Sequence, residues 1–547
     1  MACSKLFLGN LPEVTNQIIQ YLRNDLKSLY SCIFVNRHLC QITIPILWED
    51  PFVICRGHNY NFLEIYYFFF NDGDKVELKE KYGITINPSS PNKPLFNYPS
   101  LLKSFNVFRF EMHVINWINH LDCFPSIAGV EPTQARPSRK IFLPNLIEDI
   151  GFDIKKNLPN SIEIIDSICI LLFKLFINSD ASLNNLRLLS SSKVNFLPEM
   201  HKLILTNPKI TSDLKVISLD VSNEPILTSL LSISSSIRQL NLYYGGKSTN
   251  VSSVIRSQSR LSSLSFDNLT YDVYLMNAFK FYPQTLTSIE FKLCNFTNIS
   301  SLEGIQYLSQ LKSLYFFHCR GLTVRAFQSL LVHPNPLKIK TLRVHGRNPG
   351  INLLLRKVGL ELEHLDLMLF ERNEREKAFD TIINYCYKIK FLLLSWINSD
   401  DTYQLFELIT RVNNHIKYLS LENLDSCQLG SNLLKELGQI LPDSLRYLVL
   451  CIRIDANDLK IFLNNCKHIK LTHLLVSNFN VKNIDLIFSL LKEFVKKQKV
   501  KNFAYQISSS FDPNNDEHRN FEKLFDEIQP FVNMKKYSDL VIKISDL

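Results

Sequence analysis

The chain contains 547 residues and carries a formal net charge of +9, with 46% hydrophobic and 21% charged residues. These fractions are typical of a folded globular protein and exclude a chain that is disordered over most of its length. Only 15 residues are glycine, which argues against Gly-rich linkers and Gly-rich phosphate-binding loops.

Residues 1–50 carry the pattern of three short helices. Pro12 suits the first turn of a helix, because its missing N–H group would have no partner at that position anyway. Asp25 stands where a helix cap belongs, and apolar residues recur at helical spacing over 26–33. A third helix is expected from Arg37 to about Pro45. Three helices this short bury little area among themselves, so the pattern predicts that they need a partner.

The order of residues in this segment resembles the F-box. Leu-Pro-Glu at 11–13 is followed by an isoleucine, a Tyr-Leu pair, a Leu-x-x-Leu pair, Val-Asn-Arg at 35–37 and Leu-Trp at 47–48. The family often has cysteine where Asn36 stands and tryptophan where Leu39 stands, and neither difference removes the apolar stripe. The alternative is an ordinary helical hairpin that closes one end of a larger fold.

F-boxes dock on the Skp adaptor of cullin-type ubiquitin ligases through these helices. The resemblance therefore implies an adaptor-binding set made of Leu11, Pro12, Ile18, Leu22, Leu26, Leu29, Val35 and Trp48.

Residues 51–200 predict a mainly helical connector with exposed loops. The apolar run SICILLFKLFI at 167–177 contains a lysine and is shorter than the roughly 20 residues that cross a bilayer, so we expect a buried helix. The segments 87–100 and 130–140 are rich in proline and serine, which is typical of loops. NDGDK at 71–75 lacks the remaining oxygen ligands of a calcium loop and predicts a plain turn.

From about residue 201 the chain repeats itself. Variants of the motif L-x-x-L-x-L begin at residues 214, 237, 261, 286, 311, 339, 362, 389, 416, 445, 471 and 500. The motif and its spacing are those of leucine-rich repeats, in which each unit contributes a short strand and a returning segment. MHKLILTNP, which begins at residue 200, predicts a further weak unit at the start, since terminal repeats are often atypical.

These repeats predict an α/β fold in which a leucine-rich-repeat horseshoe follows an N-terminal three-helix F-box. Leu419 and Leu421 illustrate one unit: both point to the core, whereas Ser420 between them points to the other side of the strand. Amphipathic helices are expected on the convex side, and the parallel sheet on the concave side. We divide the chain into an F-box at 1–50, a connector at 51–200, a leucine-rich-repeat solenoid at 201–525 and a C-terminal tail or cap at 526–547.

The outward positions of the strands predict a target-binding surface. They are small or polar in the early units, but in the fifth to eighth units aromatic residues, arginine and methionine gather, a mixture that is enriched in protein interfaces. We expect a protein target to bind Tyr315, Phe317, Arg343, His345, Asp366, Met368, Phe391 and Leu393. The alternative is that flanking loops or the C-terminal tail cover this patch.

The chain resembles F-box and leucine-rich-repeat proteins over nearly its whole length. Its sequence is similar in character to those of the large fungal F-box families. The resemblance implies a substrate-recognition subunit of a Skp-cullin-F-box ubiquitin ligase, which holds a target near a conjugating enzyme and carries no catalytic residues itself. The alternative is a non-catalytic scaffold that uses the same two surfaces without ubiquitin transfer. We expect no cofactor, because the sequence contains no phosphate-binding or catalytic motif.

Charge and cysteine spacing add two expectations. The basic stretch KEFVKKQKVKNF at 492–503 is interpreted as the solvated face of a helix; a nucleic-acid patch is the alternative, which no aromatic interleaving supports. The 12 cysteines include no C-x-x-C pair, so we interpret them as small buried side chains and expect no metal site.

We expect a cytoplasmic or nuclear protein that binds neither nucleic acid nor a membrane, since no signal peptide or membrane span is found.

Overall fold

The computed structural model of the chain divides into two compact units, Met1–Leu240 and Asn241–Leu547. The structure describes residues 12–54, 62–84, 94–120, 161–189, 195–220, 228–230, 236–245, 251–270, 276, 278–282, 284–332, 337–412, 415–422, 427–478, 483–507 and 533–534.

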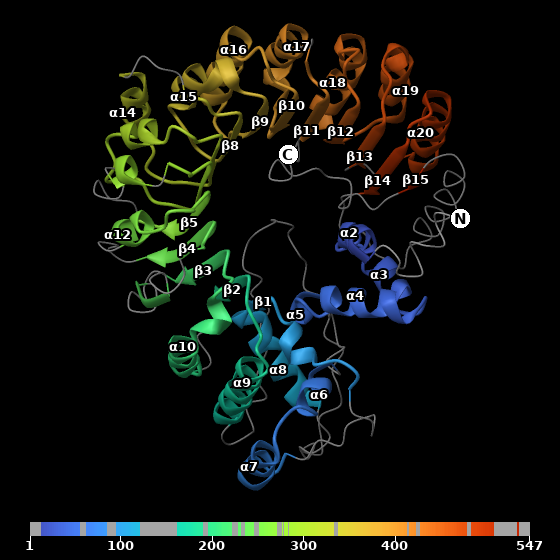
Figure 1. Cartoon of the computed structure of the whole chain (residues 1–547). Coiled ribbons are helices and arrows are strands. Elements are labelled where there is room, and N and C mark those ends of the chain that lie inside the picture. Colours follow the sequence, from blue (N-terminus) through green and yellow to red (C-terminus); the bar gives the residue numbers. More distant parts are fainter. Residues whose placement is uncertain are drawn as a thin grey trace, which may run out of the picture. The chain divides into compact units, whose positions relative to one another are not determined.

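The first unit begins with the three helices α2 (Pro12–Tyr21), α3 (Leu26–Ile33) and α4 (Arg37–Leu47), which Figure 1 labels. Asp25 caps α3 by accepting a hydrogen bond from the Ser28 N–H at 3.2 Å. Asn36 caps α4 in the same way, accepting from the Leu39 N–H at 2.8 Å. The three helices predicted from the sequence are therefore confirmed as helices.

Helix α4 extends past the proline at which the sequence predicts its end. Pro45 lies inside the helix and removes one backbone hydrogen bond. The Trp48 N–H still donates to the Ile44 carbonyl at 3.0 Å, so the last turn stays closed and the helix ends at Leu47.

An aromatic core holds the rest of the first unit together. Its elements are α5 (Pro51–Ile54), α6 (Phe62–Tyr67), α7 (Asp72–Tyr82), η1 (Tyr98–Leu101), α8 (Val107–His120), α9 (Ser161–Asn178), α10 (Leu197–Thr206) and η2 (Pro208–Thr211). Phe52 packs edge-on against Phe105 and Phe110, with ring centroids 6.1 and 5.3 Å apart. Phe173 and Phe176 of α9 are fully buried, which confirms the buried helix expected at 167–177. None of the described helices combines the length and apolar character that a membrane span needs.

Two strands of the first unit fall where the sequence predicts mainly helices. β1 (Ser104–Asn106) pairs in parallel with β2 (Asn185–Leu188), which pairs in parallel with β3 (Val216–Asp220). The sequence from Leu183 reads L-x-x-L-x-L, so the signal for β2 is present but is missed when the repeats are counted from residue 201.

Two local expectations in this unit are wrong. The weak repeat expected from residue 200 is helix α10, in which Met200 and Ile204 are buried one helical turn apart. Residues 71–75 form the start of α7 and not a plain turn: Asn71 accepts a hydrogen bond from the Asp74 N–H at 2.8 Å and so caps the helix.

The second unit is a parallel sheet whose strands follow one another in chain order. Its strands are β5 (Ser263–Leu269), β6 (Ser288–Lys292), β7 (Ser313–Phe317), β8 (Thr341–His345), β9 (His364–Met368), β10 (Phe391–Ser395), β11 (Tyr418–Glu422), β12 (Tyr447–Ile452), β13 (His473–Asn478), β14 (Asn502–Ile507) and β15 (Asn533–Met534); β4 (Gln239–Gly245) lies at the boundary between the units. Every repeat predicted from the sequence contains a strand, which begins two residues after the first residue of the repeat. The predicted α/β fold with a parallel sheet is confirmed.

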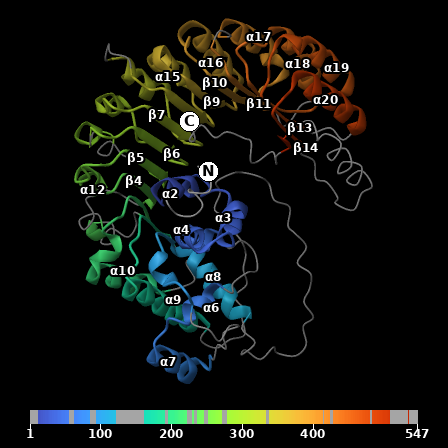
Figure 2. The ribbon, with the colours of Figure 1, turned by 45° about the vertical axis from the view of Figure 1, so that its right-hand side comes forward.

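Helices cover the convex face of this sheet in the second unit (Figures 1 and 2). The later strands are connected by α15 (Ile351–Val358), η6 (Gly359–Glu361), α16 (Arg372–Tyr385), η7 (Ser399–Asp401), α17 (Thr402–Arg411), α18 (Cys427–Ile440), α19 (Ala456–Asn465), η8 (Cys466–His468) and α20 (Ile484–Gln498). Earlier connections are shorter: α12 (Val251–Arg256), η3 (Ala278–Phe281), η4 (Glu303–Tyr307), α14 (Val324–Gln328) and η5 (Ser329–Leu331). The described parts of these earlier connections contain only short helices and 3-10 turns, which commonly serve as short connectors.

Buried thiols join neighbouring repeats just after the strands. Cys294 donates its thiol hydrogen to the Phe266 carbonyl, and Cys319 donates to the Phe291 carbonyl, both at 3.4 Å. Both cysteines are free and buried, as are Cys169, Cys386 and Cys466. The interpretation of the cysteines as small buried side chains is confirmed for these residues.

Gly321 lies after β7, where the backbone of the preceding repeat approaches closely. Its φ is +75°, and a Cβ atom there would lie 2.3 Å from the backbone nitrogen of Thr297. We expect Gly321→Ala to destabilise the protein by more than the roughly 1–2 kcal/mol of a left-handed non-glycine residue, because the Thr297 backbone must also move. Urea denaturation followed by circular dichroism measures the change.

Gly83→Ala is the matched control. Gly83 has a φ of +69° but no atom within 4 Å of its would-be Cβ atom. It should show the backbone effect alone, so equal losses in the two variants would contradict the importance of the close approach.

Candidate functional site

Large apolar side chains are exposed on α2, α3 and the loop that follows α3. The inner side of the three helices forms a core from Ile19, Leu29, Leu39 and Ile46. The outer side leaves Tyr21 90% and Phe34 72% exposed. We call the whole exposed set the docking face; it consists of Val14, Ile18, Tyr21, Leu26, Tyr30, Phe34 and Val35. Val14, Ile18 and Tyr21 recur at helical spacing along one side of α2, and large exposed apolar patches commonly mark interaction sites.

The docking face contains part of the adaptor-binding set that the resemblance implies. Ile18, Leu26 and Val35 are exposed, and Leu22 is half-buried against the core. Leu29 is wrong as a contact residue: it is 0% exposed and belongs to the core of the helices. Leu11 and the side chain of Pro12 lie outside the described residues.

Trp48 also points inward. Its ring centroid lies 4.2 Å from that of Tyr98 and 5.6 Å from that of Tyr66, so it fastens α4 to the aromatic core of the first unit. The sequence reasoning also omits Tyr30 and Phe34 from the adaptor-binding set, although their rings pack edge-on with centroids 5.2 Å apart. Their helical spacing from Leu26 is the signal that identifies them.

In the second unit, a buried carboxylate organises the strand face opposite the helices. Asp366 on β9 accepts a hydrogen bond from Arg343 Nε at 2.5 Å. Its other carboxylate oxygen is hydrogen-bonded to His345 Nε2 at 2.7 Å. Burial raises the pKa of the Asp366 carboxyl, but His345 and Arg343 together outweigh burial and hold this pKa below its ordinary value. We call these three residues the Asp366 cluster.

A second carboxylate lies two strands further along. Glu422 accepts hydrogen bonds from the Ser395 hydroxyl at 3.1 Å and from the Ser420 hydroxyl at 3.2 Å. Burial raises the pKa of Glu422, and the negative charge of Asp366 raises it further. The centre of this strand face is therefore polar, and side chains on neighbouring strands hydrogen-bond both carboxyl groups.

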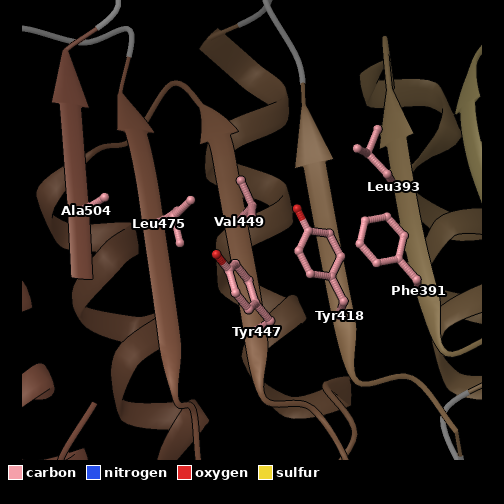
Figure 3. Close-up of a cluster of buried hydrophobic side chains, with 7 residues drawn as sticks. All are labelled: Phe391, Leu393, Tyr418, Tyr447, Val449, Leu475 and Ala504. Atoms are coloured by element: carbon pink, nitrogen blue, oxygen red, sulfur yellow. The ribbon is translucent and has the colours of Figure 1, made fainter. Parts of the chain in front are cut away.

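Beyond it lies an apolar strip that Figure 3 draws on the strands β10 to β14. Phe391 stacks on Tyr418 with ring centroids 3.8 Å apart, and Tyr418 packs on Tyr447 at 4.8 Å. Tyr447 in turn stacks on His473 at 4.3 Å. The stack follows from the register, since these residues occupy the same position in successive strands. We call it the aromatic strip; its buried members are Phe391, Leu393, Tyr418, Tyr447, Val449, Leu475 and Ala504.

The structure brings the predicted target-binding residues together but does not leave all of them accessible. Tyr315, Arg343, Asp366 and Leu393 are successive register partners, as are Phe317, His345 and Met368. The partly exposed members are Tyr315, Phe317, Arg343 and Met368. The expectation that this patch is exposed is wrong for the buried members His345, Asp366, Phe391 and Leu393.

The reason is lateral packing between repeats. Phe391 stacks against Tyr418 in the aromatic strip, and the Asp366 carboxylate is enclosed by the Arg343 and His345 side chains that it holds. Truncation of Phe391 or Arg343 would therefore affect folding as well as any binding. Sequence reasoning misses Tyr418, Tyr447 and His473, although their recurrence directly before the first aliphatic core position of each strand is visible in the repeats.

The basic stretch at 492–503 begins in α20, where Phe494 and Val495 are buried and Lys497 is exposed. This supports the interpretation of the helical part as a solvated face. Among the residues that the structure describes, no group of His, Cys, Asp and Glu is placed to hold a metal ion.

No protein-family model matches the chain, and no curated protein matches it. Among solved structures, the chain is similar to the leucine-rich repeat-containing protein LegL7 from Legionella pneumophila, with 12% sequence identity and a TM-score of 0.33. The similarity covers 63% of this chain and 96% of that chain. The repeat architecture of this chain rests on its own strands and helices.

Proposed function

We propose that this protein is the substrate-recognition subunit of a Skp-cullin-F-box ubiquitin ligase. The observation that carries the proposal is the docking face on α2 and α3, which coincides with the F-box-like order of residues over 11–48. A small helical core with an exposed apolar side is typical of a surface that binds a partner protein. The partner that the resemblance implies is the Skp adaptor, with the cullin bound beyond it.

The repeats supply the second half of this function. Their parallel sheet is a rigid ladder, and rigid elements position a bound partner better than loops do. The half-buried residues Tyr315, Phe317 and Met368 lie beside Arg343, the partly exposed member of the Asp366 cluster, so apolar side chains and one charged group are accessible together. A target held there and an adaptor held on α2 and α3 would bring a target lysine close to a conjugating enzyme, and transfer then proceeds as if within one molecule.

A non-catalytic scaffold that uses the same surfaces is the second candidate, because the docking face supports any adaptor-bound assembly equally well. The two candidates differ in whether a cullin is recruited, so co-purification separates them. From cells in which the ligase is inactive, the intact chain should recover the Skp adaptor, a cullin and an accumulating target protein. Adaptor without cullin would favour the scaffold, and recovery of neither would contradict the proposal.

A further inference from the structure

A row of cations runs along one edge of the second unit. The second residue of a repeat, directly before the strand, is basic in most units from β7 onward. We call these residues the basic row; all are exposed, and they are Lys312, Lys340, Lys390, Lys417, Arg446 and Lys501.

The backbone holds the row in register. The Lys340 N–H donates to the Lys312 carbonyl at 2.8 Å, the Lys417 N–H to the Lys390 carbonyl at 2.8 Å, and the Arg446 N–H to the Lys417 carbonyl at 2.9 Å. Glu363 and Thr472 fill the two remaining positions and continue the same ladder. Because adjacent strands lie about 4.8 Å apart, the row presents roughly one cation per strand at that spacing.

A second set of cations widens the row. Lysines stand two positions earlier in several repeats, and all are exposed: Lys338, Lys388, Lys470 and Lys499. Ile389 lies between Lys388 and Lys390 and is fully buried. The two lysines flank this buried residue and are both exposed, so neither side chain belongs to the core.

Glu363 shows how the row holds a carboxylate. Its two oxygens accept hydrogen bonds from Lys340 Nζ at 2.7 Å and from Lys390 Nζ at 2.5 Å. These hydrogen bonds lower the pKa of Glu363 to about 2.

The other end of the row lacks such an anion. Among the described residues, neither Lys417 nor Lys501 has an ion-pair partner, and Arg446 donates to the backbone carbonyls of Asp443 and Leu445. Like charges on neighbouring strands repel one another, so this part of the row carries unfavourable electrostatic energy that an external anion would relieve.

We propose that the basic row binds a carboxylate-rich, extended segment of a partner protein across β10 to β14. The proposal rests on the protein-binding role of the repeats and names the chemistry of the partner, but it does not need the adaptor. Glu363 shows that the spacing of the row suits a carboxylate. Tyr387 is 58% exposed beside Lys388, but within described residues 415–507 no phenylalanine or tyrosine is exposed, so single-stranded nucleic acid would find no stacking platform beside Lys417, Arg446 and Lys501.

Binding of a synthetic peptide tests the proposal. The probe is a fluorescent peptide of alternating glutamate and serine, long enough to span β10 to β14, and fluorescence anisotropy is measured with the full chain at low and moderate salt. We expect salt-sensitive binding that weakens by about tenfold, or about 1.4 kcal/mol, in the triple variant Lys417→Gln, Arg446→Gln, Lys501→Gln.

The matched control is the triple variant Lys377→Gln, Lys460→Gln, Lys467→Gln, which removes the same charge from exposed lysines outside the row. Its affinity should stay close to that of the intact chain. Equal losses in both triple variants would mean that net charge and not the row attracts the peptide. Tighter binding of single-stranded RNA or of anionic lipid vesicles than of the peptide would also overturn the proposal.

Adaptor binding measured on the same proteins separates this proposal from the proposed function. A chain that binds the adaptor but not the peptide would overturn the inference about the basic row alone. A chain that binds the peptide but not the adaptor would overturn the ligase assignment alone.

Discussion

Replacement of Asp366 by asparagine is expected to lower the free energy of unfolding by about 3 kcal/mol, because breaking a buried ion pair leaves a charge without compensation. Asp366 is 0% exposed, and its carboxylate is the shared partner of Arg343 and His345. Asparagine has nearly the same volume, so the loss reports the charge and not a cavity. Urea denaturation near neutral pH measures it.

The same carboxylate makes stability depend on pH. Burial raises the pKa of Asp366, but His345 and Arg343 together lower it by more than burial raises it. In the folded protein this pKa therefore lies below its ordinary value. A group whose pKa is lowered by folding contributes stability above its unfolded pKa of about 3.9, and this stability is lost as the pH falls through the folded pKa. We expect Asp366→Asn to lack this acid-dependent component.

Asp443→Asn is the control. Asp443 is exposed, and its substitution removes a carboxylate of the same kind from the same unit. It should leave both the stability and its pH profile close to those of the intact chain. If Asp366→Asn and the intact chain lost stability in parallel between about pH 5 and pH 2, the Asp366 cluster would not be the source of the acid sensitivity.

Simultaneous replacement of Ile18, Leu26 and Val35 by alanine is expected to weaken binding of the Skp adaptor by well over tenfold. These side chains are 43%, 39% and 59% exposed, so their truncation leaves the core of the three helices in place. Truncation of an interface hot spot commonly costs about 2 kcal/mol or more, although such losses do not add. Calorimetric titration of the purified adaptor into each protein measures the change.

A variant that truncates three exposed apolar side chains in the second unit serves as the control. Val324, Val332 and Leu360 are 42%, 74% and 55% exposed in the second unit, and alanine at these three positions should leave adaptor affinity unchanged. Undiminished adaptor binding by the folded Ile18, Leu26 and Val35 variant would place the adaptor elsewhere and remove the support for an F-box.

The sequence by itself determined where the strands of the repeats begin. A period of two within each strand, and the return of the same pattern in each repeat, are properties of neighbouring residues, so they can be read without knowing the fold. Local chemistry likewise determined the starts of α3 and α4, because Asp25 and Asn36 cap helices within three residues of themselves. Where such signals were weak, as at β1 and α10, the sequence reasoning was wrong.

Only the tertiary structure decided which outward positions a partner can reach. Alternation along a strand gives the side on which a residue lies, but exposure depends on neighbours from other repeats. Phe391 is buried because the register places Tyr418 against it, and Asp366 is enclosed because β8 supplies Arg343 and His345. Leu29 and Ile18 both follow the apolar spacing of their helices, yet packing of α2, α3 and α4 buries the first and exposes the second. Burial is a sum over contacts between segments distant in the chain, and no local pattern contains that sum.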